Sequence, residues 1–415
     1  MSKGALRWLC SLLFLLLFAT AITASGAETI KTFGGSEVDS GNSIRSIAND
    51  GYIIAGSHDK DIWILKVKPD GTKDWGYINP NGKAMSVALI GDSYIATGSK
   101  GSALWLSKID KNGVVSWEKT FGVTGKSIGY SVSPTTDGGY IIVGTTDSKG
   151  AGKEDIWLIK TDSQGNTGGN KGWDYTFGGP YEDRGLEVHQ VIDGYIIVGT
   201  TQTPNNGMGD IWLIKTDLKG VKSWDKTFGK AAGPAYDYGG YGNTGSSVVP
   251  VTENNEVHYI LALTKCPWGS PNCDGWLMKL DSSGNPVWEK NIGDPKIEDY
   301  ISKIQPTSDG GIIAVGSAGT DGSSADVIVT KASKSGDVIW SKRINAGFPN
   351  YNLGRSIDPT QDGGYAVTGS SFFHPTSDDQ LLLIIYHPDT THPSPLDLTD
   401  KQRWWKWLTT TYNHF

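Results

Sequence analysis

Residues 155–160 read DIWLIK, and the sequence around them decides the fold. The apolar run YIIVGTT precedes them at residues 140–146, and a turn rich in Asp and Gly follows them. Trp173 then opens a further run, WDYTFGG. The same order returns at residues 195–228 and, in degraded form, along nearly the whole chain. Self-similarity of this kind marks a repeat architecture, in which each unit buries its apolar faces against its neighbours.

Each repeat contains four short apolar segments separated by turns. The 55 glycines and the lack of sustained helical periodicity favour short strands joined by tight turns. Asp-Gly pairs such as Asp137-Gly138 join the first two segments, and this pair is the strongest short hairpin signal. The sequence therefore predicts an all-β fold of four-stranded antiparallel sheets. In the first repeat the expected strands are residues 43–48, 51–56, 61–67 and 74–78.

The last of the seven repeats lacks its fourth segment. It runs from DGGYAVTGS at 362–370 to DDQLLLIIYHPD at 378–389, and no Trp-containing segment follows in register. ETIKTFGG at 28–35 matches the fourth segments of other repeats, such as EKTFG after Trp117. Pairing this amino-terminal segment with the last repeat closes a ring and removes an open sheet edge. We predict a seven-bladed β-propeller over residues 28–392, closed by the amino-terminal strand.

The chain opens with the features of a secretory leader. Lys3 and Arg7 form a positive region, residues 9–24 are apolar, and Ser25-Gly26-Ala27 is a small-residue cleavage site. We predict a signal peptide over residues 1–27, with an uncleaved membrane anchor as the alternative. The protein is then expected to be secreted, on the cell surface or periplasmic.

The net charge, the cysteines and the last residues of the chain limit the kinds of partner to be expected. The net charge of −7 gives no basic footprint for nucleic acid. Cys266 and Cys273 flank PWGSPN, and in an exported protein such a pair most simply forms a disulfide, since a metal site needs more ligands. Residues 393–415 form an aromatic and basic tail that lies in a membrane interface, packs on the propeller or binds a partner. A membrane is expected only through this tail or an uncleaved leader, and the oligomeric state stays open.

The turns that precede the tryptophans, as in SGNPVW and KNGVVSW, resemble the tryptophan-docking repeat of the quinoprotein alcohol dehydrogenase-like (PQQ-type) propellers. Over residues 28–390 the chain more closely resembles exported bacterial and archaeal propeller proteins. The quinone enzymes use adjacent cysteines and usually eight blades, which this chain lacks, so PQQ is not expected. The resemblance implies that a docking Trp packs between neighbouring blades, at Trp75, Trp117, Trp173, Trp224, Trp288 and Trp340.

The long loops of this sequence belong to one face of the predicted propeller. In propellers of this winding, loops from second to third strands emerge on the same face as the links between blades. Long loops on a rigid scaffold are where binding residues concentrate, so we predict a binding face there. The long segments are residues 148–154, 204–209, 266–273, 319–324, 372–377 and 230–245.

Two sets of side chains on that face are candidate binding residues. Asp155 and Asp210 stand just before third strands, and Asp39 and Asp183 follow Phe-Gly segments, each in an Asp-x-Gly pattern. They either form a carboxylate ring that holds a cation such as calcium, or a sugar or peptide, or cap their own turns. The second set belongs to asymmetric loops and suits carbohydrate stacking or protein contacts, with packing under a loop as the alternative. Its members are Tyr236, Asp237, Tyr238, Tyr241 and Trp268.

No recognisable catalytic set accompanies the repeats. There is no CxxCH haem motif and no P-loop. We therefore expect a non-enzymatic exported propeller, without a cofactor, that binds a protein or glycan through the long-loop face. The alternative is a glycoside hydrolase or lyase-type enzyme that uses carboxylates at the tunnel mouth. A passive surface component without a discrete ligand is the third possibility.

Overall fold

The computed structural model describes the central part of the chain, between residues 26 and 388. The described residues are 26–35, 37–122, 124–169, 171–202, 210–228, 244–265, 273–294, 296–319, 324–346, 351–373 and 378–388. Their regular structure is entirely β-strand. Consistent with this, they contain no helix with the length and apolar character that crossing a membrane requires. The chain divides into two units, of which Thr29–Ile385 is the larger and contains the propeller.

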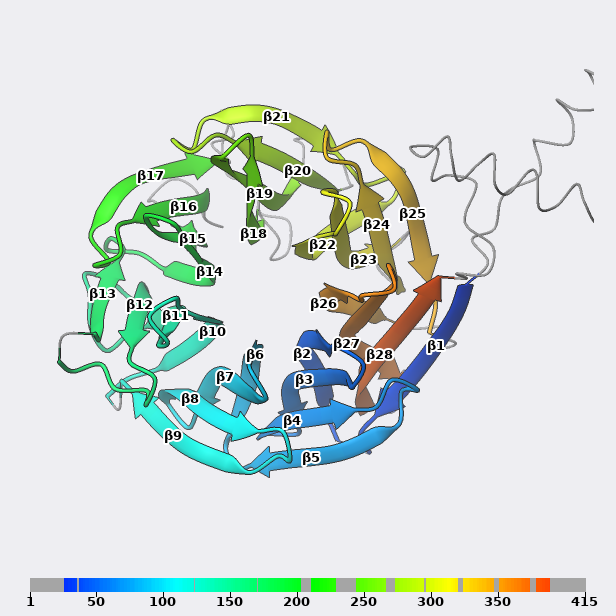
Figure 1. Ribbon diagram of the computed structural model, residues 1–415, viewed down its shortest axis with the longest axis horizontal. Coiled ribbons are helices and arrows are strands. Elements are labelled where there is room, and N and C mark those ends of the chain that lie inside the picture. Colours follow the sequence, from blue (N-terminus) through cyan, green and yellow to red (C-terminus); the bar gives the residue numbers. More distant parts are fainter. Residues whose placement is uncertain are drawn as a thin grey trace, which may run out of the picture. The chain divides into compact units, whose positions relative to one another are not determined.

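Seven four-stranded antiparallel sheets, the blades, form a ring, which confirms the predicted fold (Figure 1). Blade 1 is β2 (Asp39–Ile47), β3 (Gly51–His58), β4 (Asp61–Val67) and β5 (Lys73–Asn79). Blade 2 is β6 (Gly82–Ile90), β7 (Ser93–Lys100), β8 (Ala103–Asp110) and β9 (Val115–Phe121). Blade 3 is β10 (Ser127–Pro134), β11 (Tyr140–Thr146), β12 (Asp155–Thr161) and β13 (Trp173–Phe177). Blade 4 is β14 (Asp183–Val191), β15 (Gly194–Thr201), β16 (Asp210–Thr216) and β17 (Lys222–Phe228).

The ring continues with three further blades. Blade 5 is β18 (Thr244–Glu253), β19 (Glu256–Lys265), β20 (Asp274–Leu280) and β21 (Pro286–Asn291). Blade 6 is β22 (Glu298–Pro306), β23 (Ile312–Gly319), β24 (Ala325–Ala332) and β25 (Val338–Ile344). Blade 7 is β26 (Asn352–Pro359), β27 (Tyr365–Phe373), β28 (Asp378–Pro388) and, as its outer strand, β1 (Gly26–Phe33).

The outer strand of blade 7 comes from the amino-terminal side of the chain. The sheet order is β1-β28-β27-β26, so β1 pairs with β28 and not with blade 1 (Figure 1). Phe33 packs against the cluster of buried residues that contains Tyr52 and Leu383. This confirms the predicted closure.

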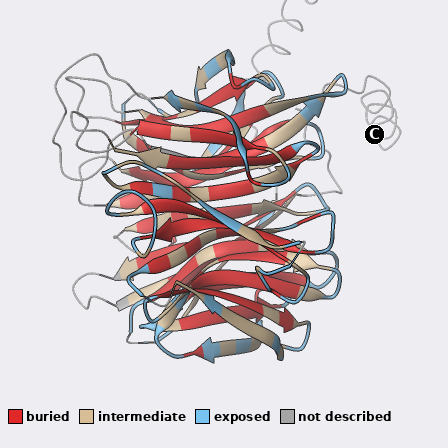
Figure 2. Ribbon diagram, turned by 90° about the vertical axis from the view of Figure 1, so that its left-hand side faces the viewer, coloured by how far each residue is buried: buried red, intermediate tan, exposed pale blue. Residues whose placement is uncertain are grey.

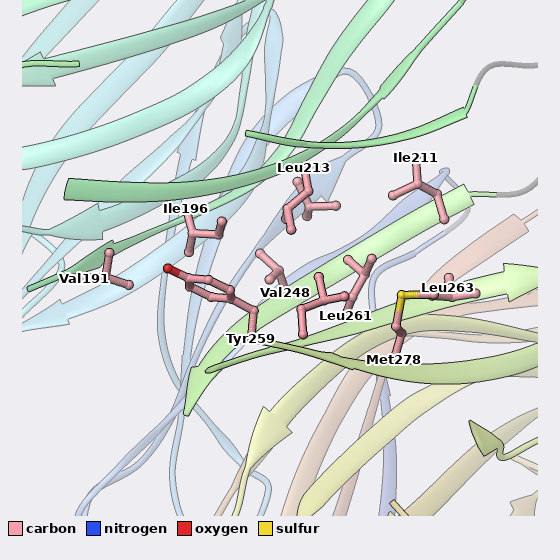
Figure 3. Packing of buried hydrophobic residues seen from close by; sticks show 11 residues of the cluster. Val191, Ile196, Ile211, Leu213, Val248, Tyr259, Leu261, Leu263 and Met278 are labelled. Atoms are coloured by element: carbon pink, nitrogen blue, oxygen red, sulfur yellow. The ribbon is translucent and has the colours of Figure 1, made fainter. Parts of the chain in front are cut away.

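The cores lie between neighbouring blades. The two middle strands of blade 3, β11 and β12, are buried along their whole length because both faces meet another sheet. The outer strand β17 alternates between exposed and half-buried residues. Figure 2 shows buried residues along the strands and exposed ones at the turns. In Figure 3, Ile196 and Leu213 of blade 4 face Val248 and Leu261 of blade 5.

The lysine that ends the DIWLIK motif joins two parts of its own blade. Lys160 is 3% exposed, yet its ammonium group lies 2.9 Å from the carboxylate of Asp137 in the turn between β10 and β11. The apolar stem is buried while the charge reaches an acid at the surface. The same pair occurs as Lys66–Asp50, Lys215–Asp193, Lys279–Glu253 and Lys331–Asp309.

Each docking Trp packs on the following blade, as the resemblance implied. The Trp173 ring lies against Tyr195 of blade 4 at a centroid distance of 5.8 Å. A Cβ atom built on Gly220, in the turn between β16 and β17, would lie 2.5 Å from the same indole. The glycine therefore provides both a positive φ and room for the ring. Gly113, Gly165, Gly284 and Gly336 take the same position against Trp75, Trp117, Trp224 and Trp288, and Trp340 stacks on Tyr365.

Substitutions at two glycines can distinguish two contributions to stability: the positive φ of the backbone and the space that the docking Trp needs. Gly220 and Gly138 have φ of 82° and 83°, but the Cβ position of Gly138 has no neighbour within 4 Å. Gly138→Ala should cost about 1–2 kcal/mol of unfolding free energy, from the left-handed conformation alone. Gly220→Ala should cost more, because the indole must move as well. Urea unfolding followed by Trp fluorescence compares the two, and equal losses would show that the contact with Trp173 is unimportant.

The innermost strand of every blade carries a β-bulge at the same place. In β2 the register steps from Gly41 to Ser43, so Asn42 is unpaired. We call such a residue the bulge residue and the next one the post-bulge residue. The bulge residues are Asn42, Met85, Tyr130, Leu186, Ser246, Ser302 and Arg355. The post-bulge residues are Ser43, Ser86, Ser131, Glu187, Ser247, Lys303 and Ser356.

Post-bulge serines join successive blades. Ser43 Oγ accepts a hydrogen bond from Val87 N of blade 2 at 3.3 Å. Ser356 Oγ accepts one from Ile44 N at 3.2 Å, across the junction where the ring closes. Ser86, Ser131 and Ser247 make the equivalent bond to Val132, Val188 and Ile304. Five blades thus use serine at this position, and blades 4 and 6 depart from the pattern with Glu187 and Lys303.

Candidate functional site

The first and third strands of each blade begin at the same end of the propeller, which we call the Asp face. Four of the predicted binding residues are first residues of such strands: Asp155, Asp183, Asp210 and Asp39. All four are buried; their exposed fractions are 1%, 0%, 6% and 0%, in the order just given. These carboxylates do not line an open surface.

Backbone N–H groups of the adjacent loops hold three of these carboxylates. Asp183 Oδ2 accepts a hydrogen bond from Gly179 N at 2.8 Å. Asp155 Oδ2 accepts bonds from Ala151 N and Gly152 N at 3.1 and 3.2 Å. Asp39 bonds Gly35 N at 3.0 Å and the His58 ring at 2.5 Å. This is the capping role that the sequence left open beside binding.

The structure brings Asp155 and Asp183 together at the junction of blades 3 and 4. A Cβ atom built on Gly178 would lie 2.0 Å from Asp155 Oδ1 and 2.8 Å from Asp183 Oδ2. The Oδ1 atoms of both residues are buried and have no hydrogen-bond partner among the described residues. Burial raises the pKa of Asp183, and the neighbouring charge of Asp155 raises it further. Asp39 and Asp210 begin strands of other junctions and do not join this pair.

A second carboxylate pair, Asp274 and Asp299, occupies the junction of blades 5 and 6. Their Oδ1 atoms are likewise buried, with no hydrogen-bond partner in the part of the chain that the structure describes. Burial and, less strongly, the charge of Asp274 raise the pKa of Asp299 to about 6. The junction of blades 6 and 7 has no such pair of carboxylates at these positions. Asn352, an uncharged residue, begins β26, and Asp326 of blade 6 forms an ion pair with Arg343 at 2.9 Å.

These pairs alone do not make a calcium site. Calcium takes 6–8 oxygen ligands. Within the described ranges there is no group of three or more His, Cys, Asp or Glu side chains that could hold a metal ion. Calcium binding therefore stays a prediction.

Asp299→Asn should stabilise the protein near neutral pH. A folded-state pKa of about 6, above the usual 3.8, means that the folded protein holds this proton more tightly than the unfolded chain. The wild type should lose about 2 kcal/mol of stability as pH rises from 4 to 7. The amide carries no charge at any of these pH values, so this loss should disappear. Urea unfolding between pH 3 and 8 measures it.

Asp137→Asn is the control with the opposite sign. Although burial opposes ionisation, Thr135, Lys160 and Gly139 lower the pKa of Asp137 to about 2. Its contribution is present above pH 4 and is lost as pH falls towards 2, so the variant should be less stable at pH 7. Unchanged pH dependence in Asp299→Asn would show that this carboxyl group titrates normally.

The other predicted site residues lie outside the described part of the chain. They are Tyr236, Asp237, Tyr238, Tyr241, Trp268 and Cys266. Cys273 is described, precedes β20 and is 8% exposed. The disulfide with Cys266 therefore stays a prediction.

The face opposite the Asp face, here the turn face, repeats one turn geometry. Asp162 O accepts a hydrogen bond from Gly165 N, and Asp162 Oδ1 accepts bonds from Gln164 N and Asn166 N. Asp217 and Asp281 repeat all three bonds in blades 4 and 5. On the Asp face, by contrast, the connection between β17 and β18 runs from Phe228 to Thr244 while that between β5 and β6 runs from Asn79 to Gly82.

A charged cluster between the inner strands was missed at the level of sequence. Glu187 is 2% exposed and lies 2.5 Å from Lys303 Nζ and 2.6 Å from His189 Nε2. Its second oxygen accepts bonds from Ser247 Oγ at 2.6 Å and Val248 N at 3.2 Å. Burial opposes ionisation of Glu187, but Lys303 and His189 outweigh it and lower its pKa. The available signal was the loss of serine at the post-bulge position in two repeats.

A serine in the pattern GKSIG at residues 125–129 has no catalytic setting. Ser127 lies in the inner strand β10, is 4% exposed and bonds the Thr146 hydroxyl at 2.8 Å. The nucleophile elbow of hydrolases places its serine between a strand and a helix. Nor do the buried Asp39, Asp155 and Asp183 offer an exposed acid to a substrate.

Comparisons with known proteins support the fold. No family model matches the chain, and no curated protein matches it in sequence. Among solved structures, it is similar to the WD40 domain of Pan2 from Neurospora crassa, with a TM-score of 0.50 and 9% identity. That match covers 86% of this chain and 90% of the Pan2 chain. At this identity the likeness shows the β-propeller fold alone.

Proposed function

We propose that this chain is an exported, non-enzymatic propeller that binds a protein partner through its Asp face. The leader-like residues 1–27 support export, to the cell surface, the periplasm or the medium. The Trp–Gly contacts between blades support a relationship to the exported bacterial and archaeal propellers of the tryptophan-docking class.

The contrast between the two faces is the observation that carries this proposal. On the turn face, blade after blade repeats the same Asp and Gly hydrogen bonds, which makes the blades alike. On the Asp face the connections differ from blade to blade, from Asn79–Gly82 to Phe228–Thr244. A surface that binds one partner specifically must not be the same in every blade. Loops of different length on a rigid scaffold provide such a surface. A glycan ligand is the second candidate, favoured by the aromatic residues in 230–245 and by Trp268.

Loop truncation tests the face assignment. The full chain and a variant shortened at 230–243 and 266–272 are exposed to the surface proteins of the exporting cells, crosslinked and compared by quantitative mass spectrometry. Capture of the partner should fall at least tenfold in the variant, while the melting temperature stays unchanged.

A variant shortened at 166–171, on the turn face, is the matched control and should capture normally. Equal capture by all three proteins would contradict the proposed face. A glycan array run in parallel decides between the two ligand classes: saturable glycan binding without protein capture would favour the second candidate.

A further inference from the structure

The residue type at the bulge position changes from blade to blade, whereas the residue types just before and after it are mostly the same. Each follows a small residue or Ile301 and precedes a post-bulge residue that is serine in five blades. The bulge residues themselves are Asn, Met, Tyr, Leu, Ser, Ser and Arg in order round the ring. A bulge re-aims the side chain of the extra residue, and bulges are common next to functional sites. The bulges lie on the innermost strands of the blades, which surround the propeller axis (Figure 1).

Three of these residues contact one another from blade to blade. Arg355 Nη1 donates a hydrogen bond to Asn42 Oδ1 at 2.8 Å, across the junction of blades 7 and 1. Asn42 Nδ2 in turn lies 2.9 Å from Ala84 O and 3.6 Å from Met85 Sδ in blade 2. All three side chains are half-buried. The bulge residues of blades 7, 1 and 2 therefore form one continuous surface.

Arg355 differs from the other arginines of the described residues. Arg45, Arg184 and Arg343 each lie within 3.6 Å of a carboxylate oxygen. Within the described part of the chain, Arg355 has an amide oxygen as its acceptor and no ion pair. A guanidinium group has five N–H donors, so most of them remain available.

The charge of Arg355 is incompletely balanced. Burial lowers its pKa, and the attraction of Asp379 only partly opposes that effect. A guanidinium group in this position gains from an added carboxylate, because its fork of donors matches two carboxylate oxygens.

Apolar residues occupy the bulge position in the next three blades. Met85, Tyr130 and Leu186 are the bulge residues of blades 2, 3 and 4, and each is half-buried. Binding sites typically combine apolar side chains with a few polar groups that fix orientation. A cation and apolar side chains at the same position of successive blades suit a peptide that carries an acid next to an apolar residue.

We propose that the bulge residues contact the partner protein and that Arg355 binds a carboxylate of it, from an Asp or Glu side chain or the C-terminus. This rests on the proposed function and adds the chemistry of the partner.

Peptide selection tests this assignment. A random twelve-residue phage library is selected on the immobilised full chain, and the enriched peptides are synthesised with each acid and with Asn, Gln or a C-terminal amide in its place. Calorimetry gives their Kd for the wild type, Arg355→Gln and Arg343→Gln. Enriched peptides should be acidic, and Arg355→Gln should weaken the acidic form about tenfold or more while leaving the neutral form unchanged. Arg343→Gln should have no effect.

Arg355→Lys, which keeps the charge, should retain part of the affinity, and circular dichroism confirms that each variant folds. Three results would overturn the assignment: no enriched peptide, enriched peptides without acids, or equal loss for acidic and neutral forms. Acidic peptides that ignore Arg355 but need residues 230–243 would overturn this inference and leave the proposed function intact. Normal partner capture after loop truncation would instead reject the proposed function.

Discussion

Lys303→Ser should destabilise the protein by about 3–5 kcal/mol, because it leaves a buried carboxylate without its closest cation. Glu187 is 2% exposed and Lys303 Nζ lies 2.5 Å from it. The substitution restores the residue that five other blades use at this position, so a purely local view predicts little effect. Guanidinium chloride unfolding followed by Trp fluorescence measures the loss.

The double variant Glu187→Ser, Lys303→Ser should recover most of that stability. Serine in place of Glu187 can accept the hydrogen bond from Val248 N, as post-bulge serines do in other blades. Lys100→Ser is the control, because Lys100 and Glu118 are both about a third exposed and such pairs contribute little. If the double variant were as unstable as Lys303→Ser, the lysine would act through packing and not through its charge.

Removal of β1 should have the second large effect. A chain without residues 1–33 should unfold at lower denaturant than one without residues 1–25. The burial of Ile30 and Phe33 together contributes about 3 kcal/mol, and the backbone hydrogen bonds to β28 are lost as well. The exposed edge of β28 should also make the shorter chain associate, which light scattering detects.

A synthetic peptide of residues 26–35 provides the control for this truncation. Added in excess, it should restore the melting temperature of the shorter chain, and a scrambled peptide should not. Two chains of equal stability would show that β1 contributes nothing to closure.

The fold could be derived from the sequence because its evidence is local and repeated. DIWLIK and DGGYIIVG recur in register, so strand order, turn type and docking tryptophans follow from one unit. The closure of the ring could be predicted by counting the segments of each repeat. The last repeat lacks its fourth segment, and the segment that forms β1 supplies it.

The ion pair of Glu187 and Lys303 could not be found in the same way. The two residues are 116 positions apart, and their contact depends on bulges that shift each inner strand by one residue. The carboxylates of the Asp face were recognised by their repetition. That repetition did not reveal which of them meet, because the meeting of Asp155 with Asp183 depends on the approach at Gly178.

The pairing of β1 with β28 has a consequence for biosynthesis. β1 precedes every other strand in the chain, and β28 follows all of them. During translation, β1 therefore remains without its partner strand until β28 has been synthesised. Contacts between such distant segments form slowly, so closure of the ring by β1 is expected to be a late step of folding.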